Sequence, residues 1–189
     1  FTDAPPKINL DQCANGPGST PVDCTGSAWK NGNLNANQAH YVEGYSVPYR
    51  AVMENLPTQT SITVVLGYDI KSGGAHAIDF LPHYDRLQPH SAFGHSAETV
   101  TPTSGVAGID VATSTSAIPA PSSTNSPVPG QPTTAFNALP AGERLMTLFG
   151  GNITNVSYVS EGDLTASSAE TQISVEFTVN ASTAVLAWG

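Results

Sequence analysis

The sequence predicts an all-β protein built from two packed antiparallel sheets, a β-sandwich of jelly-roll or immunoglobulin-like kind, with one short helix. Several short runs alternate between apolar and polar residues, the period of two that places one set of side chains on a buried face. Clusters of Pro, Gly and Asn separate these runs and supply turns. Charged residues make up 11% of the chain, against roughly 25% in average soluble proteins, a composition common in extracellular β proteins.

The clearest strand patterns lie between residues 46 and 81. Residues 47–53 alternate in the way a half-buried strand does, and residues 62–68 carry the β-branched and aromatic side chains typical of a core strand. Residues 55–60 between them have turn chemistry. The pattern therefore predicts an antiparallel hairpin, followed by the short helix over residues 75–81.

The two cysteines, Cys13 and Cys24, are predicted to form a disulfide. The ten residues between them include Gly and Pro, which lets the Cα atoms approach to about 5.5 Å. Closing this loop stabilises the fold by about 2–3 kcal/mol in the chain-entropy model. A metal site is a poorer explanation of the two cysteines, because the chain has no second pair of cysteines to complete it, and redox chemistry favours a C-x-x-C spacing.

Residues 27–44 are predicted to form an Asn-rich loop that Trp29 anchors. This loop is either plain surface or a polar platform for a sugar or cation.

Residues 100–135 differ in composition from the rest of the chain. They contain six Pro, thirteen Ser or Thr, and one charged residue, and we expect a long irregular insert lying on the sheets. Beyond it, strand patterns return at residues 145–149, 154–158 and 173–179. These complete one domain, residues 1–189. The apolar end at residues 184–189 predicts a strand that is buried in the fold, paired with a neighbouring subunit, or continued in a longer chain.

Several motifs carry a resemblance to a known kind of module. The segments CANG, W-x-NGNLN, EGYSVPYR, GGAHAIDFL-x-x-YDR, LFGGNIT and AVLAWG are similar to a recurring β-rich module of large secreted or surface-anchored bacterial proteins, adhesin-like or matrix-like chains of unassigned function. The resemblance covers most of the chain outside the insert. It implies a β architecture, a location outside the cell, and a final strand that continues past Gly189. It implies no ligand and no chemistry.

Candidate metal ligands gather in a window rich in His and Asp. Four of the five histidines, residues 76, 83, 90 and 95, fall within twenty residues, interleaved with aspartates. Calcium bound by Asp69, Asp79 and Asp85 is one hypothesis, since hard cations brace loops of extracellular β domains. A transition metal on His76 and His83 is another, although the His spacing matches no ligand motif. The alternative is structural, with Asp79 and Asp85 bonded to turn amides or to Arg86 and Arg50.

The sequence argues against several classes of function. Six Lys plus Arg stand against fifteen Asp plus Glu, without a basic cluster, which excludes nucleic acid and anionic membranes as partners. No apolar run approaches the ~20 residues of a membrane span. No G-x-S-x-G elbow or paired carboxylate motif supports hydrolysis, and we expect no enzyme. No signal segment opens the chain, so we expect either a signal removed before Phe1 or a piece of a longer polypeptide.

The function that these observations favour is structural. We expect a subunit or module of an extracellular bacterial assembly such as a surface fibre, sheath or stalk, joined to its copies by strand addition at sheet edges. The residues predicted to join copies lie in the N-terminal arm, residues 1–10, or in the last strand: Phe1, Ile8, Leu10, Val185, Leu186 and Trp188. The alternative is a monomeric, secreted adhesion domain that binds glycan or a matrix protein through its loops, with or without structural calcium as a cofactor.

Overall fold

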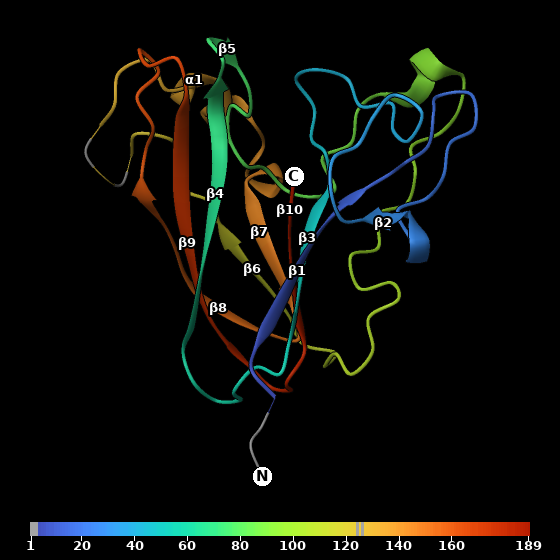
Figure 1. The fold of residues 1–189 in the computed structure, drawn as a ribbon, viewed down its shortest axis with the longest axis vertical. Coiled ribbons are helices and arrows are strands. Elements are labelled where there is room, and N and C mark those ends of the chain that lie inside the picture. Colours follow the sequence, from blue (N-terminus) through green and yellow to red (C-terminus); the bar gives the residue numbers. More distant parts are fainter. Residues whose placement is uncertain (1–3, 124, 126) are drawn as a thin grey trace.

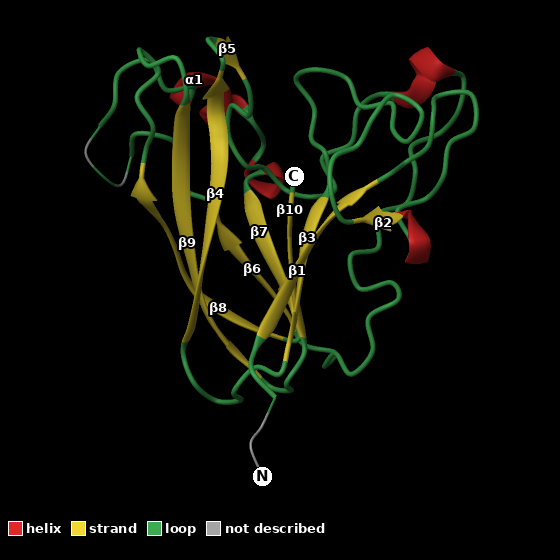
Figure 2. Ribbon diagram, in the orientation of Figure 1, coloured by secondary structure: helices red, strands yellow, loops and turns green. Residues whose placement is uncertain are grey.

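The computed structural model describes residues 4–123, 125 and 127–189 and consists of two antiparallel sheets (Figures 1 and 2). The six-stranded sheet has the order β2-β1-β3-β10-β7-β6, and the four-stranded sheet the order β5-β4-β9-β8. The first contains β1 (Lys7–Cys13), β2 (Trp29–Lys30), β3 (Tyr49–Glu54), β6 (Thr113–Ala117), β7 (Leu145–Phe149) and β10 (Ala184–Trp188). The second contains β4 (Ile62–Ser72), β5 (Ala75–His76), β8 (Gly151–Ser160) and β9 (Ala169–Val179). The predicted all-β, two-sheet sandwich is confirmed.

Helical structure is confined to short pieces. These are the α-helix α1 (Thr133–Ala138) and the 3-10 turns η1 (Gly26–Ala28), η2 (His90–Phe93) and η3 (Ala141–Glu143). Within the described part of the chain, no helix has the length and apolar character of a membrane span. The helix predicted over residues 75–81 was wrong in position. Gly73 and Gly74 take φ values of 58° and 87° and turn the chain back, so the next two residues form β5 against the end of β4.

The predicted hairpin between β3 and β4 was also wrong. β3 pairs with β1 on one side and β10 on the other, while β4 belongs to the opposite sheet and pairs with β9. The connecting segment leaves β3 through Asn55, whose φ is 58°, and Leu56 then donates its backbone N–H to the carbonyl of Ser182. The alternation of apolar residues identified both strands correctly. Their partners come from distant parts of the chain, which a local pattern does not specify.

The core lies between the two sheets. Along β9, Ile173, Val175, Phe177 and Val179 are fully buried, because the strand has partners on both edges and its apolar face meets the other sheet. Strand β10 is buried along its whole length at the centre of the six-stranded sheet. The segment expected to be irregular, residues 100–135, supplies β6, which pairs with β7 and extends the same sheet.

A layer of loops covers one end of the six-stranded sheet. We call residues 14–46 and 82–106 the loop layer (Figure 2). The predicted pairing of Cys13 and Cys24 is present, with the Cα atoms 5.4 Å apart, and it ties the end of β1 to this layer. Trp29 packs with the two cysteines and donates its indole N–H to the carbonyl of Thr101 at 3.1 Å. The disulfide and Trp29 therefore fix the base of the loop layer.

Tyr158, on β8, predicts how stability depends on pH in alkaline solution. Its side chain is 3% exposed, and burial raises its pKa from 10.0 to about 12. Between these values the unfolded chain loses a proton that the folded chain keeps, so the stabilising contribution present below pH 10 is lost as the pH rises to 12. We expect denaturant midpoints to fall over this range, and to fall less in Tyr158→Phe. Equal slopes for the two proteins would contradict the assignment.

Candidate metal centre

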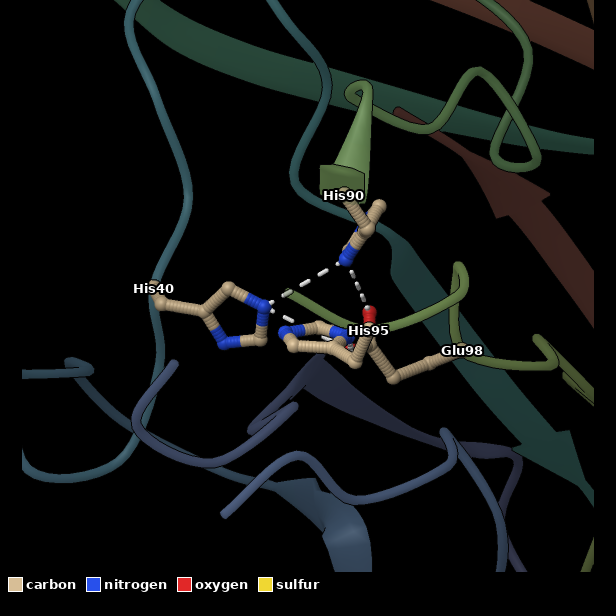
Figure 3. Close-up of side chains that lie close together, drawn as sticks. All are labelled: His40, His90, His95 and Glu98. Carbon is tan, nitrogen blue, oxygen red and sulfur yellow. Dashed lines mark hydrogen bonds and ion pairs between the residues drawn. The ribbon is translucent and has the colours of Figure 1, made fainter. Parts of the chain in front are cut away.

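Three histidines and one glutamate meet inside the loop layer (Figure 3). The ligand atoms of His40, His90, His95 and Glu98 all lie within 4.8 Å of one another. The side chains of His40, His90 and Glu98 are 5%, 2% and 4% exposed, and that of His95 is 16% exposed. Among the residues that the structure describes, no other group of three or more His, Cys, Asp or Glu side chains converges in this way. The loop layer is therefore organised around a buried polar cluster.

Local backbone structure brings three of the four side chains together. Pro89, with φ −66°, precedes η2, which begins at His90. Gly94 ends η2 with φ 80°, a left-handed conformation that glycine adopts without strain. The chain reverses at this point, and the rings of His90 and His95 come to 5.1 Å between centroids. Glu98 follows three residues after His95 and turns its carboxylate to the same centre.

His40 reaches the cluster from a separate loop and is held by Asn15 and Gly16. Its backbone N–H donates to Asn15 Oδ1 at 3.1 Å. Its ring Nδ1 lies 2.6 Å from the carbonyl oxygen of Gly16, which accepts the Nδ1 proton. This hydrogen bond selects the tautomer whose Nε2 carries a lone pair and faces the other three side chains.

Gln88 joins the two ligand-bearing loops. Its amide nitrogen donates to the carbonyl of His40 at 2.9 Å, and its Oε1 accepts from the backbone N–H of Val42 at 2.7 Å. Gln88 is 4% exposed and lies two residues before His90. The positions of His40 and His90 are consequently coupled through one buried amide.

The donor atoms of the cluster are separated by similar distances. His40 Nε2 lies 3.5 Å from His90 Nδ1 and 3.4 Å from Glu98 Oε1. His90 Nδ1 lies 3.2 Å from Glu98 Oε2, and His95 Nδ1 lies 3.4 Å from Glu98 Oε1. Most of these separations exceed the 2.7–3.2 Å typical of N–H···O hydrogen bonds. The four side chains surround a common centre without bonding tightly to each other.

Burial favours the neutral form of the His90 imidazole. Burial lowers the pKa of His90 below 6.5; the Glu98 carboxylate opposes this change, and the neighbouring His40 and His95 add to it. The ring is therefore largely uncharged near pH 7. Neutral imidazole is the form that coordinates metal ions.

Phe93 covers one side of the cluster. Its ring lies 4.9 Å from that of His40 and 6.0 Å from that of His95, centroid to centroid. Gly18 packs against this ring so closely that a Cβ atom there would lie 2.8 Å from Phe93 Cδ1. The aromatic cover separates the cluster from solvent, so the polar groups must find their partners within the loop layer.

A second feature, an apolar groove, lies where the two sheets part. It has a volume of about 950 Å³. One wall comes from β1, β3 and β10, the other from β4 and residues 76–82, and residues 41–47 line it as well. The side chains that face it include Ile8, Leu10, Val64, Leu66 and Trp188. The sandwich is therefore open along one side.

The metal ligands predicted from the sequence occupy other places. Asp69, His76 and Asp79 line the groove, and Asp85 donates its backbone N–H to His83 Nδ1 at 3.2 Å within a turn. The described residues do not bring these five side chains together as one ligand group. Calcium on the three aspartates and a transition metal on the two histidines stay predictions.

The arginines pair differently from the structural alternative proposed for the aspartates. Arg50 pairs with Asp11 at 3.0 Å, and Arg86 pairs with Glu143 at 2.9 Å. Neither pairs with Asp79 or Asp85, so that part of the expectation was wrong. Both carboxylate partners lie on segments distant in sequence, which the local pattern around residues 69–86 does not reveal.

The residues predicted to join copies fall into two groups. Ile8 and Leu10 lie on β1 and are 55% and 48% exposed. The other group, Val185, Leu186 and Trp188, is buried in β10, where neighbouring strands of the same chain occupy both edges. Phe1 lies outside the described residues. The exposed pair on β1 is accordingly the part of this prediction that is available for contacts with another copy.

None of the four residues of the cluster was among the ligands predicted from the sequence, and His40 and Glu98 were not singled out at all. His90 and His95 belong to the His-rich window, and the spacing H-x4-H-x2-E places three potential ligands within nine residues. That spacing was the available signal. His40 lies fifty residues upstream in an Asn-rich loop, and only the folded chain brings it to the other three.

Comparison with protein-family models, with curated proteins and with solved structures found no match to this chain, so the candidate centre stands on its own geometry.

Proposed function

We propose that the chain is a non-enzymatic structural module of an extracellular assembly, in which copies join by strand addition at the open side of the sandwich. The observation that carries the proposal is the groove, whose apolar side chains belong to the core-facing side of two strands, β1 and β4, that are each unpaired along part of one edge. A sandwich with this opening resembles one from which a strand is missing. We infer that a strand of a second copy covers this opening by pairing along a free edge.

On β1, residues that face the interior remain half exposed. Ile8 is the cross-strand partner of Met53, and Leu10 is the partner of Ala51. Cross-strand partners project from the same face of a sheet, and Met53 and Ala51 are both 1% exposed. Ile8 and Leu10 therefore point to the core side, where they lack cover.

The same pattern recurs across the groove on β4. Ile62, Val64 and Leu66 share a face with Tyr68 and Ile70, because alternate residues of a strand project to the same side. Tyr68 and Ile70 are buried, whereas the first three are partly exposed. The uncovered part of β4 thus faces the uncovered part of β1.

The backbone edges beside the groove are free to pair. In the described chain, β4 pairs with β9 on one edge. Its other edge pairs with β5 at Lys71 and Ser72 and accepts backbone hydrogen bonds from Ala77 and Ile78 at Ile70 and Asp69, which leaves residues 62–68 unpaired on that side. The outward edge of β1 meets β2 only at its last two residues, and the side chain of Asn31 reaches the carbonyl of Leu10. Unpaired edges of this kind are templates for β-addition.

We assign the vacant position to a second copy of the chain. The two free edges differ, so joining β1 of one copy to β4 of the next is a heterologous contact, and repeated contacts of that type build a filament. The pairing of Cys13 with Cys24 and the low charge content support a location outside the cell, where disulfides persist. The apolar side chains of β1 and β4 that are partly exposed in a single chain are then covered by the neighbouring copy.

The test places charges on the groove face of β1. We expect the wild-type chain to form filaments in electron micrographs and fast-sedimenting species that grow with concentration. The double variant Ile8→Asp/Leu10→Asp should sediment as a monomer, since buried carboxylates oppose strand addition. The matched control is Val159→Asp on β8, which is 51% exposed outside the groove and should assemble like the wild type. Circular dichroism checks that all three proteins remain folded.

Two results would overturn the proposal. A wild-type chain that stays monomeric at every concentration removes the assembly, and the monomeric adhesion domain becomes the better hypothesis. Filaments that persist unchanged in the double variant place the joint elsewhere. A discrete dimer abolished by the double variant would keep strand addition but replace the filament with a closed pair.

A further inference from the structure

We propose that His40, His90, His95 and Glu98 bind one divalent transition-metal ion, zinc in the first instance, and that this ion closes the loop layer. This inference is independent of strand addition, since none of these four residues lines the groove. It assigns a structural metal site to a chain that also carries a disulfide in the same layer.

Three of the separations between donor atoms are close to the edge lengths of a tetrahedral site. Zinc binds His nitrogen and carboxylate oxygen at about 2.0–2.2 Å, and a tetrahedron with such bonds has edges of about 3.3–3.6 Å. The distances from His40 Nε2 to His90 Nδ1 and Glu98 Oε1 are 3.5 and 3.4 Å, and that from His90 Nδ1 to Glu98 Oε2 is 3.2 Å. A metal ion at the centre would meet these donors without a large rearrangement.

Without a metal ion, the cluster leaves buried polar atoms unsatisfied. Glu98 Oε1 has no hydrogen-bond partner, and its side chain is 4% exposed. His95 Nε2 is also buried without a hydrogen-bond partner, and so is His90 Nε2, although the His90 atom that faces the centre is Nδ1. A buried carboxylate in this state costs free energy that coordination removes. The unpartnered carboxylate oxygen is the second observation, besides the converging geometry, that points to an ion.

The surrounding residues hold the ligands as an outer coordination shell does. His40 donates its Nδ1 proton to the carbonyl of Gly16, which orients Nε2 toward the centre. Asn15 contacts Glu98 Oε2 through its amide nitrogen at 3.4 Å and accepts the backbone N–H of His40. His95 Nδ1 lies 2.8 Å from the carbonyl of Ser96. Each of these contacts restricts a ligand to one orientation before the ion arrives.

The donor set identifies the class of ion. Three imidazoles and one carboxylate suit zinc and its first-row neighbours, whereas calcium takes six to eight oxygen ligands. One carboxylate and three neutral rings leave a net charge of +1 with a divalent ion, a smaller buried charge than an ion without a carboxylate ligand. Four protein ligands complete a tetrahedron, which is typical of structural zinc sites.

The ion would connect segments that are distant in sequence. His40 belongs to the loop before β3, and the other ligands belong to the loop after β5. Ions that bind the folded state alone raise the free energy of unfolding by mass action. Ordering of residues 40–46 and 88–98 should accordingly depend on the metal.

The experiment uses the full chain, which is first treated with a chelator to remove bound metal and then separated from the chelator. We expect one equivalent of Zn²⁺ to bind by calorimetry, with a rise of several degrees in melting temperature at excess zinc. Co²⁺ should give the intense visible absorption of tetrahedral cobalt. His95→Ala and Glu98→Gln should weaken zinc binding by more than about 100-fold, because even changes to outer-shell residues cost 10–100-fold. The matched control, His76→Ala on exposed β5, should bind like the wild type.

The outcome is decided on the wild-type chain even if a variant fails to fold. Less than stoichiometric zinc binding, an unchanged melting temperature and octahedral cobalt spectra would overturn the proposal and leave a buried His/Glu cluster only. Zinc binding that is as tight in Glu98→Gln and His95→Ala as in the wild type would overturn the assignment of ligands. Filament formation can succeed or fail in the same samples without affecting either result.

Discussion

Replacing Asp11 with alanine is expected to lower the free energy of unfolding by about 3–5 kcal/mol, the cost of leaving a buried charge without its partner. Asp11 and Arg50 face each other across β1 and β3, with Arg50 Nε 3.0 Å from Asp11 Oδ2. Both residues are buried, at 5% and 7% exposure. The alanine variant therefore retains a guanidinium in the interior and removes the carboxylate that neutralises it.

Arg50 also anchors the loop layer, which enlarges the expected effect. Its Nη1 donates to the carbonyls of Pro102 and Ser104, each at 2.8 Å, and its guanidinium lies 4.7 Å from the ring centre of Trp29. Chemical denaturation should show a lower midpoint in Asp11→Ala with an unchanged slope. The double variant Asp11→Ala/Arg50→Met should regain the part of the loss that comes from the unpaired charge. It should not regain the rest, because Met cannot donate to the carbonyls of Pro102 and Ser104.

The same two strands supply a matched control. Lys7 and Glu54 pair at 2.8 Å in the same ladder, but their side chains are 64% and 46% exposed. Exposed pairs contribute about 0–1 kcal/mol, so Glu54→Ala should change stability little. Equal losses in Glu54→Ala and Asp11→Ala would contradict the role assigned to burial.

Strand positions were largely predictable because alternation is a local property. Residues 62–68, 145–149 and 173–179 all lie in strands of the structure. Pairing was not predictable, since β3 finds its partners in β1 and β10, at opposite ends of the chain. The helix expected at residues 75–81 failed because the turn at Gly73 and Gly74 offers β4 a partner, and pairing outweighs a short helical pattern.

The candidate centre shows the same division between local and distant information. The spacing of His90, His95 and Glu98 is visible in the sequence. The sequence does not show that the chain turns at Gly94, which brings the three side chains together. His40 has no local signal, because its place depends on Asn15, Gly16 and the distant Gln88. The ligands predicted from the sequence, at residues 69–85, come shortly before His90 in the chain, and none of them belongs to this cluster.

Phe177→Ala should have an effect as large as the loss of Asp11, about 3–5 kcal/mol of unfolding free energy, and for a different physical reason. Phe177 is fully buried on β9, between its cross-strand partners Ile62 on β4 and Ile153 on β8. The truncation removes apolar contacts and leaves a cavity that two paired strands cannot collapse to fill. Phe177→Leu, which keeps most of the volume, should lose much less.

The contrast between the two large effects identifies which part of the molecule each residue supports. Hydrogen exchange on Phe177→Ala should accelerate in β4, β8 and β9 and leave the loop layer near its wild-type protection, because Phe177 contributes to the inter-sheet core. In Asp11→Ala, faster exchange should appear first around residues 100–106, which Arg50 anchors. Uniform acceleration in both variants would mean that the sheets and the loop layer unfold as one unit. Separate patterns would show that the loop layer is held by its own anchors, the disulfide and the buried ion pair, rather than by the core.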